Sequence, residues 1–205
     1  MAWLVAVLCL LIAGASAPAA WAQRITTENV GSAETEAGNI LADAVRAAGG
    51  ADIGFVPAVA FKPGASAPRP ATPAQAAGLV EPADDRVVVL SLRGEEVLAA
   101  LERSVSFAPQ RSSGFLQVSG LRFVYDPGRS GKRVVSASVN GQDLKATGTY
   151  RVAMTRPLAS GQQGYFQIWS GKDARDTGKT LAEALRDRGG SLSAPPEGRI
   201  TARGR

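Results

Sequence analysis

GFLQVSGLRFVYD, residues 114–126, carries the strongest local information about the fold of this 205-residue chain. Its second half, LRFVY, has the apolar, aromatic and β-branched composition of a strand, and the Asp-Pro-Gly sequence that follows favours a turn. In its first half, the aromatic residue Phe115 directly follows a glycine. The stretch LASGQQGYFQIW, residues 158–169, repeats this order with Gly164 and Tyr165.

Two aromatic rings placed in this way can flank a planar ligand. Every nucleobase offers a π face, and stacking on an aromatic side chain contributes about 1–3 kcal/mol per base. The alternative is that Phe115 and Tyr165 both pack in the hydrophobic core, as most large aromatic residues do. The two stretches alone leave both interpretations open.

Helical and strand patterns alternate along the chain without a regular β-α-β rhythm. Apolar residues at helical spacing predict helices over residues 32–49, 95–105 and 177–188, the first capped by Ser32 and ended by a glycine pair. Residues 57–73, rich in proline, alanine and glycine, predict a long loop. Strands are predicted over residues 53–56, 86–92, 121–125, 133–139, 142–144, 150–155 and 197–201. We therefore expect an α+β fold of the α/β type, with a mixed β-sheet covered by helices.

The composition excludes several kinds of catalysis. The chain has no histidine and one cysteine, Cys9, so histidine acid–base chemistry, Ser-His-Asp triads, disulfides and nearly all zinc sites are ruled out. The acidic residues lack the spacing of a calcium-binding loop. We expect no catalytic residue, no metal site and no cofactor in this chain.

The chain carries a formal net charge of +5. Its arginines are scattered, so no nucleic-acid-binding arm is indicated and no nucleic acid is expected as a partner. A positive charge of this size favours anionic partners in general terms, and a solvated basic surface is the simpler interpretation.

The N-terminal residues 2–22 contain no charged side chain. Residues 3–12 have the composition of a signal-peptide core, and Ala20-Trp21-Ala22 before Gln23 fits a cleavage site. We expect a signal peptide over residues 1–22 that is cleaved after Ala22, one domain over residues 23–205, a periplasmic or secreted location, and no membrane contact after cleavage. An uncleaved membrane anchor is the alternative, since about 20 apolar residues can span a bilayer.

The order of several segments resembles the C-terminal domain of the 5′-nucleotidases. These segments are AGNILADAVRAAGGADIGF (37–55), VVVLSLRGEEVLAALERSV (87–105), GFLQVSGLRFVYDP (114–127), YRVAMTRPLASGQQGY (150–165) and EGRI (197–200). The resemblance implies a substrate-binding domain that holds a nucleobase between two aromatic rings. By position, Phe115 falls on the first stacking aromatic and Tyr165 on the second, with Gly164 before it.

The chain departs from the family at the residues that bind phosphate. The N-G-G-G-x-R stretch of the family corresponds to PAVAFK, residues 57–62, so Lys62 stands in place of an arginine and offers a point charge instead of a bidentate fork. P-F-G-N becomes PADD, residues 82–85, and G-G-D-G becomes GQQG, residues 161–164. These changes suit a nucleoside-like or other aromatic ligand better than a nucleotide, and they suit a domain that has lost its ligand almost equally well.

The resemblance also implies a separate catalytic half. In the family this is an N-terminal metallophosphoesterase with two metal ions, and the segment before residue 32 is too short to form one. We expect the chain to bind a nucleotide or nucleoside as an accessory to a separate metallophosphoesterase subunit. One alternative is hydrolysis by this chain alone, although nothing in the sequence replaces the two metal ions that such hydrolysis uses in the family. The other is a structural or interaction domain without a ligand.

Overall fold

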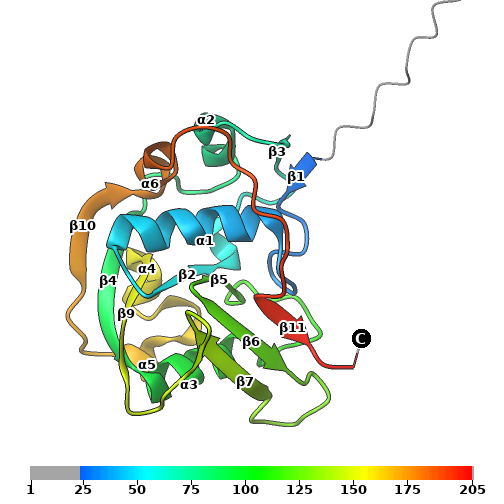
Figure 1. The fold of residues 1–205 in the computed structure, drawn as a ribbon, viewed down its shortest axis with the longest axis vertical. Coiled ribbons are helices and arrows are strands. Elements are labelled where there is room, and N and C mark those ends of the chain that lie inside the picture. Colours follow the sequence, from blue (N-terminus) through cyan, green and yellow to red (C-terminus); the bar gives the residue numbers. More distant parts are fainter. Residues whose placement is uncertain (1–23, 205) are drawn as a thin grey trace, which may run out of the picture.

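The structure is a computed structural model that describes residues 24–204, so the predicted signal peptide and its cleavage site lie outside the described residues. Its largest sheet is mixed and has the strand order β10-β4-β9-β2-β5, with β2 and β9 parallel and the other neighbours antiparallel (Figure 1). In that order the strands are Arg175–Thr180, Arg86–Arg93, Thr149–Thr155, Ile53–Pro57 and Leu116–Ser119.

A second sheet of four strands has the order β11-β6-β7-β8. Its strands are Ile200–Ala202, Leu121–Tyr125, Val134–Val139 and Gln142–Asp143. A short antiparallel pair joins β1 (Arg24–Thr26) to β3 (Ser66–Pro68). The helices are α1 Glu36–Gly49, α2 Pro73–Ala77, α3 Gly94–Ser104, α4 Arg156–Ala159, α5 Phe166–Trp169 and α6 Leu181–Asp187, with short 3-10 turns η1 Ala58–Ala60 and η2 Gln162–Gly164. The expected α+β architecture, a mixed sheet covered by helices, is confirmed.

Helix α1 lies across one face of the main sheet (Figure 1). Its apolar side is buried because alanine, leucine and valine recur at helical spacing, and it approaches β2 so closely that a Cβ at Gly54 would lie 2.5 Å from the Ala42 carbonyl oxygen. The helix begins at Glu36, four residues later than the sequence predicts. Thr35, not Ser32, is the N-cap, and its side chain accepts a hydrogen bond from the Gly38 N–H at 3.0 Å.

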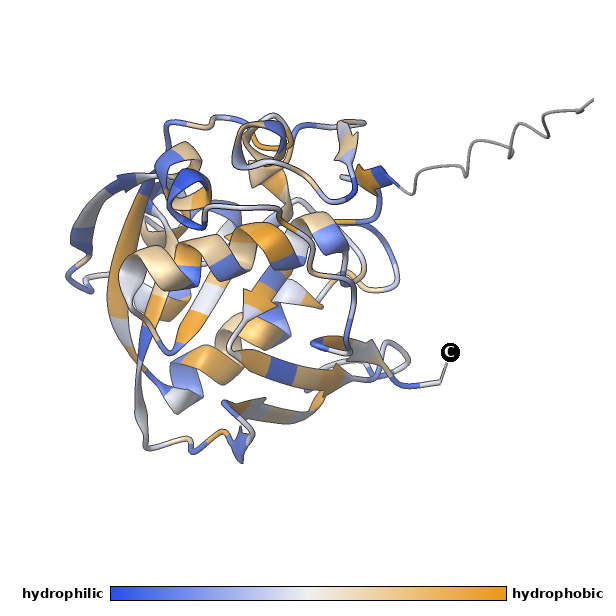
Figure 2. Cartoon of the chain, turned by 45° about the horizontal axis from the view of Figure 1, so that its top comes forward, coloured by the Kyte–Doolittle hydropathy of each residue, from blue (hydrophilic) through white to orange (hydrophobic). Residues whose placement is uncertain are grey.

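The central strands β4 and β9 are buried on both faces. Four consecutive apolar residues, 87–90, have at most 5% of their surface exposed, as expected for a strand covered on both sides. Figure 2 shows this apolar centre as orange strands beneath α1, while the edge strand β10 is more polar. The hydrophobic core therefore lies between α1 and this sheet and continues past the sheet toward α3 and α4.

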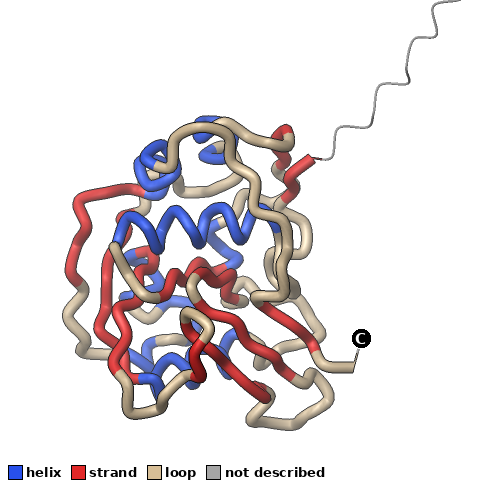
Figure 3. The backbone as a smooth tube through the Cα atoms, viewed as in Figure 1, coloured by secondary structure: helices blue, strands red, loops and turns tan. Residues whose placement is uncertain are grey.

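Two segments differ from the sequence prediction for non-local reasons. Within the predicted long loop, residues 66–68 form β3 by pairing with β1, and η1 follows β2 directly. The predicted last helix begins only at Leu181, because residues 175–180 form β10 along β4. Figure 3 shows how much of the remaining chain is loop, including the C-terminal segment that crosses α1 before β11. Across residues 24–204, no helix combines the length and the apolarity needed to cross a membrane.

Candidate functional site

The two aromatic stretches singled out in the sequence meet in the fold. The Tyr165 hydroxyl donates a hydrogen bond to the Gly114 carbonyl oxygen at 2.7 Å, and the Ser113 hydroxyl donates to Gln163 Oε1 at 2.6 Å. Backbone bonds then tie the first stretch to η1, which directly follows β2, since the N–H of Ala58 donates to the Phe115 carbonyl at 2.8 Å and that of Val59 to the Ser113 carbonyl at 2.9 Å. The loops at residues 57–62, 111–115 and 161–165 thus form one connected cluster.

The rings of Phe115 and Tyr165, however, are buried within this cluster. Phe115 is 2% exposed and Tyr165 is 0% exposed. Tyr165 stacks instead on Trp169, with ring centroids 4.9 Å apart and 9° between planes. The expected open slot between Phe115 and Tyr165 is not present among the described residues, because a ring without exposed surface offers no face to a ligand. Ligand stacking on this pair stays a prediction that requires both rings to leave the core.

Gly164 and Lys62, the other predicted ligand contacts, have different surroundings. Gly164 has a φ of +83°, a conformation that favours glycine, and a Cβ there would lie 2.6 Å from Nε of the Arg103 side chain, which would have to shift. Lys62 is exposed, and its backbone is held by Leu79 and Thr27. Neither residue lines the pockets described next.

Two adjoining pockets share Val59 and Glu81 in their walls. The smaller has a volume of about 270 Å³ and the larger about 740 Å³. Pro57 and Thr155, which line the smaller one, end the parallel neighbours β2 and β9. Ligands of α/β proteins commonly bind beyond the carboxyl ends of strands. We call these two pockets together the joined pockets.

The smaller pocket is acidic in character. Glu81 and Asp85 line it, and no lysine or arginine does. Burial, and then the charge of neighbouring Asp84, raises the pKa of the Asp85 carboxyl above its ordinary value. A carboxyl perturbed in this way inside a pocket is typical of a functional site. The larger pocket instead contains Arg111, whose guanidinium donates to Asn29 Oδ1 at 2.6 Å.

The comparisons with known proteins identify the family. The model of the 5′-nucleotidase, C-terminal domain matches residues 12–170, more than half of the chain. The chain belongs to this family. The predicted resemblance is thereby confirmed, and the fold of this 5′-nucleotidase C-terminal domain is the one expected from it.

The similarity covers one part of longer relatives. An apyrase from Aedes albopictus is 31% identical over 114 residues, which are 48% of this chain and 20% of the apyrase. A snake venom 5′-nucleotidase from Naja atra is 35% identical over 89 residues, 39% of this chain and 17% of that protein. The chain thus matches about a fifth of the length of these curated relatives.

Solved structures show the same fold. The 5′-nucleotidase precursor from Thermus thermophilus superposes with a TM-score of 0.78 and 29% identity, covering 90% of this chain and 39% of the other. The NAD nucleotidase of Haemophilus influenzae has a TM-score of 0.65 at 18% identity, over 82% of this chain and 33% of that one, which supports the fold alone.

Sequence reasoning missed part of the lining of the joined pockets in this 5′-nucleotidase C-terminal domain. The departures from the family at residues 57–62, 82–85 and 161–164 lie in loops that reach these pockets. No sequence signal identified Arg111, because its position depends on a loop that packs against residues 29–31. Within residues 24–204, no group of three or more acidic or cysteine side chains is placed to hold a metal ion.

Proposed function

We propose that this domain binds a nucleoside-like ligand in the joined pockets, with the heterocycle in the smaller one. The observation that carries this proposal is a pocket of about 270 Å³ with apolar and polar walls at the carboxyl ends of β2 and β9. Ligand pockets usually have volumes of about 300–1,000 Å³, so this one is sized for a small ring system.

The walls of the smaller pocket match a nucleobase in chemistry. Val59, Pro157 and Leu158 supply apolar surface for the faces of a ring. The carboxyls of Glu81 and Asp85 are acceptors for the N–H groups of a base, and the amide of Gln162 can both donate and accept. These acceptors also repel a phosphate, so the phosphate of a nucleotide would have to extend away from this pocket.

The larger pocket offers room for that extension. It shares Val59 and Glu81 with the smaller pocket, and its wall carries Arg111 together with a second carboxylate, Glu28. Arginine is well suited to oxyanions and to sugar hydroxyls. We infer that a ribose and any phosphate would lie on this side, with the nucleoside bound at least as tightly as the nucleotide.

The proposal includes an accessory role in nucleotide breakdown. A chain without histidine lacks the imidazole ligands of the family's two-metal site, so hydrolysis would be carried out by a separate metallophosphoesterase to which this domain presents its ligand. The apolar N-terminal run is consistent with export, where such a pair would meet extracellular nucleotides.

Isothermal titration calorimetry with adenosine and AMP tests the binding step. We expect saturable binding in the micromolar to millimolar range, with adenosine no weaker than AMP. Val59→Trp fills the shared wall with little cost to folding because Val59 is 48% exposed, and it should abolish binding. Val135→Trp, at a 38% exposed valine on β7 outside the pockets, is the matched control and should bind normally.

A domain that has lost its ligand is the second candidate, and the burial of Phe115 and Tyr165 favours it. In that case neither adenosine nor AMP produces heat at about 5 mM, a concentration at which even a millimolar site is largely filled. Such a result would leave a structural or interaction domain as the remaining function.

A further inference from the structure

A third hollow, of about 570 Å³, lies at the opposite end of β2 from the joined pockets. Ala51, in its wall, precedes β2, whereas Pro57, in the smaller joined pocket, ends that strand. A strand rises about 3.3 Å per residue, so the five residues of β2 separate the two places by about 16 Å. We call this hollow the arginine hollow.

Four elements form the arginine hollow. They are the C-terminal half of α1, the turn between β5 and β6, the hairpin between β7 and β8, and the C-terminal segment after α6. Its charged lining residues are Asp43, Arg46, Arg122, Arg188, Glu197 and Arg199. Four arginines therefore face two carboxylates.

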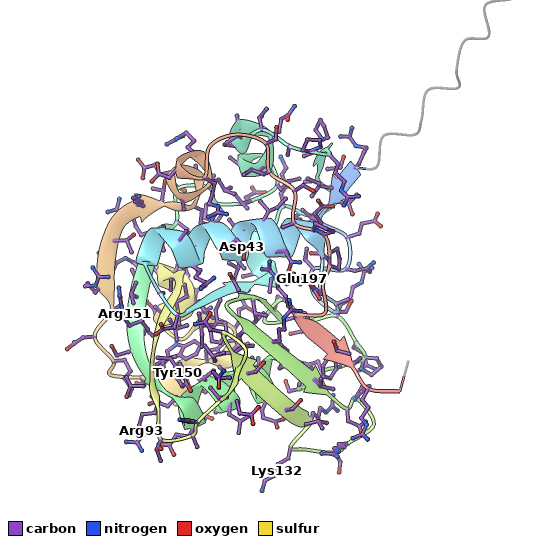
Figure 4. The ribbon with its side chains drawn as sticks, in the orientation of Figure 1. Asp43, Arg93, Lys132, Tyr150, Arg151 and Glu197 are labelled. Carbon is purple, nitrogen blue, oxygen red and sulfur yellow. The ribbon has the colours of Figure 1, made fainter. Side chains whose placement is uncertain are left out.

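Both carboxylates are already neutralised by two of the arginines. Arg199 bonds both oxygens of Asp43, at 2.6 and 3.1 Å, and its Nε lies 2.8 Å from Glu197. Arg122 lies 3.2 Å from the other Glu197 oxygen. Figure 4 shows Asp43 and Glu197 near one another where the C-terminal segment passes α1. These pairs form the structural wall of the hollow.

The other two arginines have no acidic partner within the described part of the chain. Arg46 donates from Nε to the Asp52 carbonyl at 3.1 Å and from Nη2 to Asn140 Oδ1 at 3.3 Å, which holds its guanidinium while Nη1 has no partner among residues 24–204. Arg188 is exposed, and its guanidinium has no hydrogen bond or ion pair to any described residue. The hollow thus carries an excess of two positive charges, one of them fixed in place.

We propose that the arginine hollow binds an oxyanion of the phosphate class, either free or as the phosphate of a small ester, through Arg46 and Arg188. Guanidinium groups match the geometry of phosphate oxygens, and a guanidinium held in advance loses little freedom on binding. The lining is mostly polar, and the Ser138 hydroxyl adds a further donor. This site differs from the joined pockets in position and in the charge of its walls.

Titration of the full chain with inorganic phosphate, followed by calorimetry at low ionic strength, tests this proposal. We expect saturable binding that weakens about tenfold in Arg46→Gln and in Arg188→Gln, because each charge-assisted hydrogen bond contributes that much or more. Arg175→Gln, at an exposed arginine of β10 outside the hollow, is the matched control and should bind phosphate as the wild type does.

Two further titrations identify the source of the oxyanion and make this test independent of the proposed nucleoside binding. Tighter binding of glycerol phosphate than of inorganic phosphate would assign the site to an ester, and the reverse order to the free ion. Adenosine, which has no phosphate, should bind both variants as it binds the wild type. Its titration therefore tests the joined pockets independently of phosphate binding in the arginine hollow. The proposal is overturned if phosphate gives no saturable heat, or if Arg188→Gln, which breaks no side-chain hydrogen bond or ion pair within residues 24–204, binds phosphate unchanged.

Discussion

At the scale of single residues, the burial of Tyr165 changes what the family resemblance means for this chain. The sequence places Tyr165 beside Gly164 as a ligand contact, yet in the fold its hydroxyl closes a loop and its ring packs on Trp169. The sequence order could not show this, because whether an aromatic ring faces a cleft or the core depends on neighbours such as Trp169 and Gly114 that only the fold brings together.

Tyr165→Phe tests this structural role. The substitution removes the 2.7 Å hydrogen bond to the buried Gly114 carbonyl and leaves the ring in place. We expect the free energy of unfolding to fall by about 0.5–1.5 kcal/mol, measured by urea denaturation. Tyr150→Phe is the control: among residues 24–204 its oxygen accepts one exposed bond, from the Lys145 N–H, so its loss should cost less. Equal losses in the two variants would contradict the role given to Tyr165.

Asp85 provides a second prediction at this scale. Burial raises the pKa of its carboxyl, so the folded state holds the proton more tightly than the unfolded state does. The ionised carboxyl therefore destabilises the fold once the pH rises through the folded pKa, and this penalty is absent below the unfolded pKa, at about pH 4. A loss of stability of this kind is expected if Asp85 serves the proposed binding pocket.

Asp85→Asn should consequently be more stable than the wild type at pH 7 and no more stable at pH 3.5. Urea denaturation at the two pH values measures the difference. Asp143→Asn, on the exposed strand β8, serves as control and should shift stability little at either pH. An Asp85→Asn variant less stable than the wild type at pH 7 would show that its carboxyl forms a stabilising contact instead.

At the scale of elements, local patterns located most of the fold. Strand β6 occupies the predicted residues 121–125, and the Asn140-Gly141 turn joins β7 to β8 because both residues have positive φ. The errors occur where pairing is non-local. Residues 177–180 are predicted as helix from their spacing but belong to β10 beside β4, and β3 forms by pairing with β1.

The start of α1 gives a prediction that separates sequence from structure. The sequence places the cap at Ser32, whereas in the fold Thr35 accepts the Gly38 N–H. Gln117, fully buried on β5, also accepts the Thr35 N–H and fixes this residue in place. Thr35→Ala should lower the unfolding free energy by about 0.5–2 kcal/mol. Ser32→Ala should change the unfolding free energy by less than about 0.5 kcal/mol. A larger loss in Ser32→Ala than in Thr35→Ala would show that Ser32 caps the helix instead.

At the scale of the whole molecule, the chain keeps the fold of its family, whereas its candidate site is formed by loops. The family, the mixed sheet and the covering helices follow from segments that keep their order along the sequence. The candidate site does not follow in the same way, because the joined pockets are assembled from segments far apart in sequence, within residues 27–31, 57–64, 81–85, 111–113 and 155–163. The positions of these loops depend on the packed core beneath them.

The location of a bound nucleoside is the most direct test of the proposal that the joined pockets hold the ligand. A crystal structure of the protein with saturating adenosine is predicted to show the base in the smaller pocket, between Val59 and Gln162 and beside Asp85, with the ribose toward Arg111. Empty joined pockets at saturating adenosine, with Tyr165 still stacked on Trp169, would contradict it.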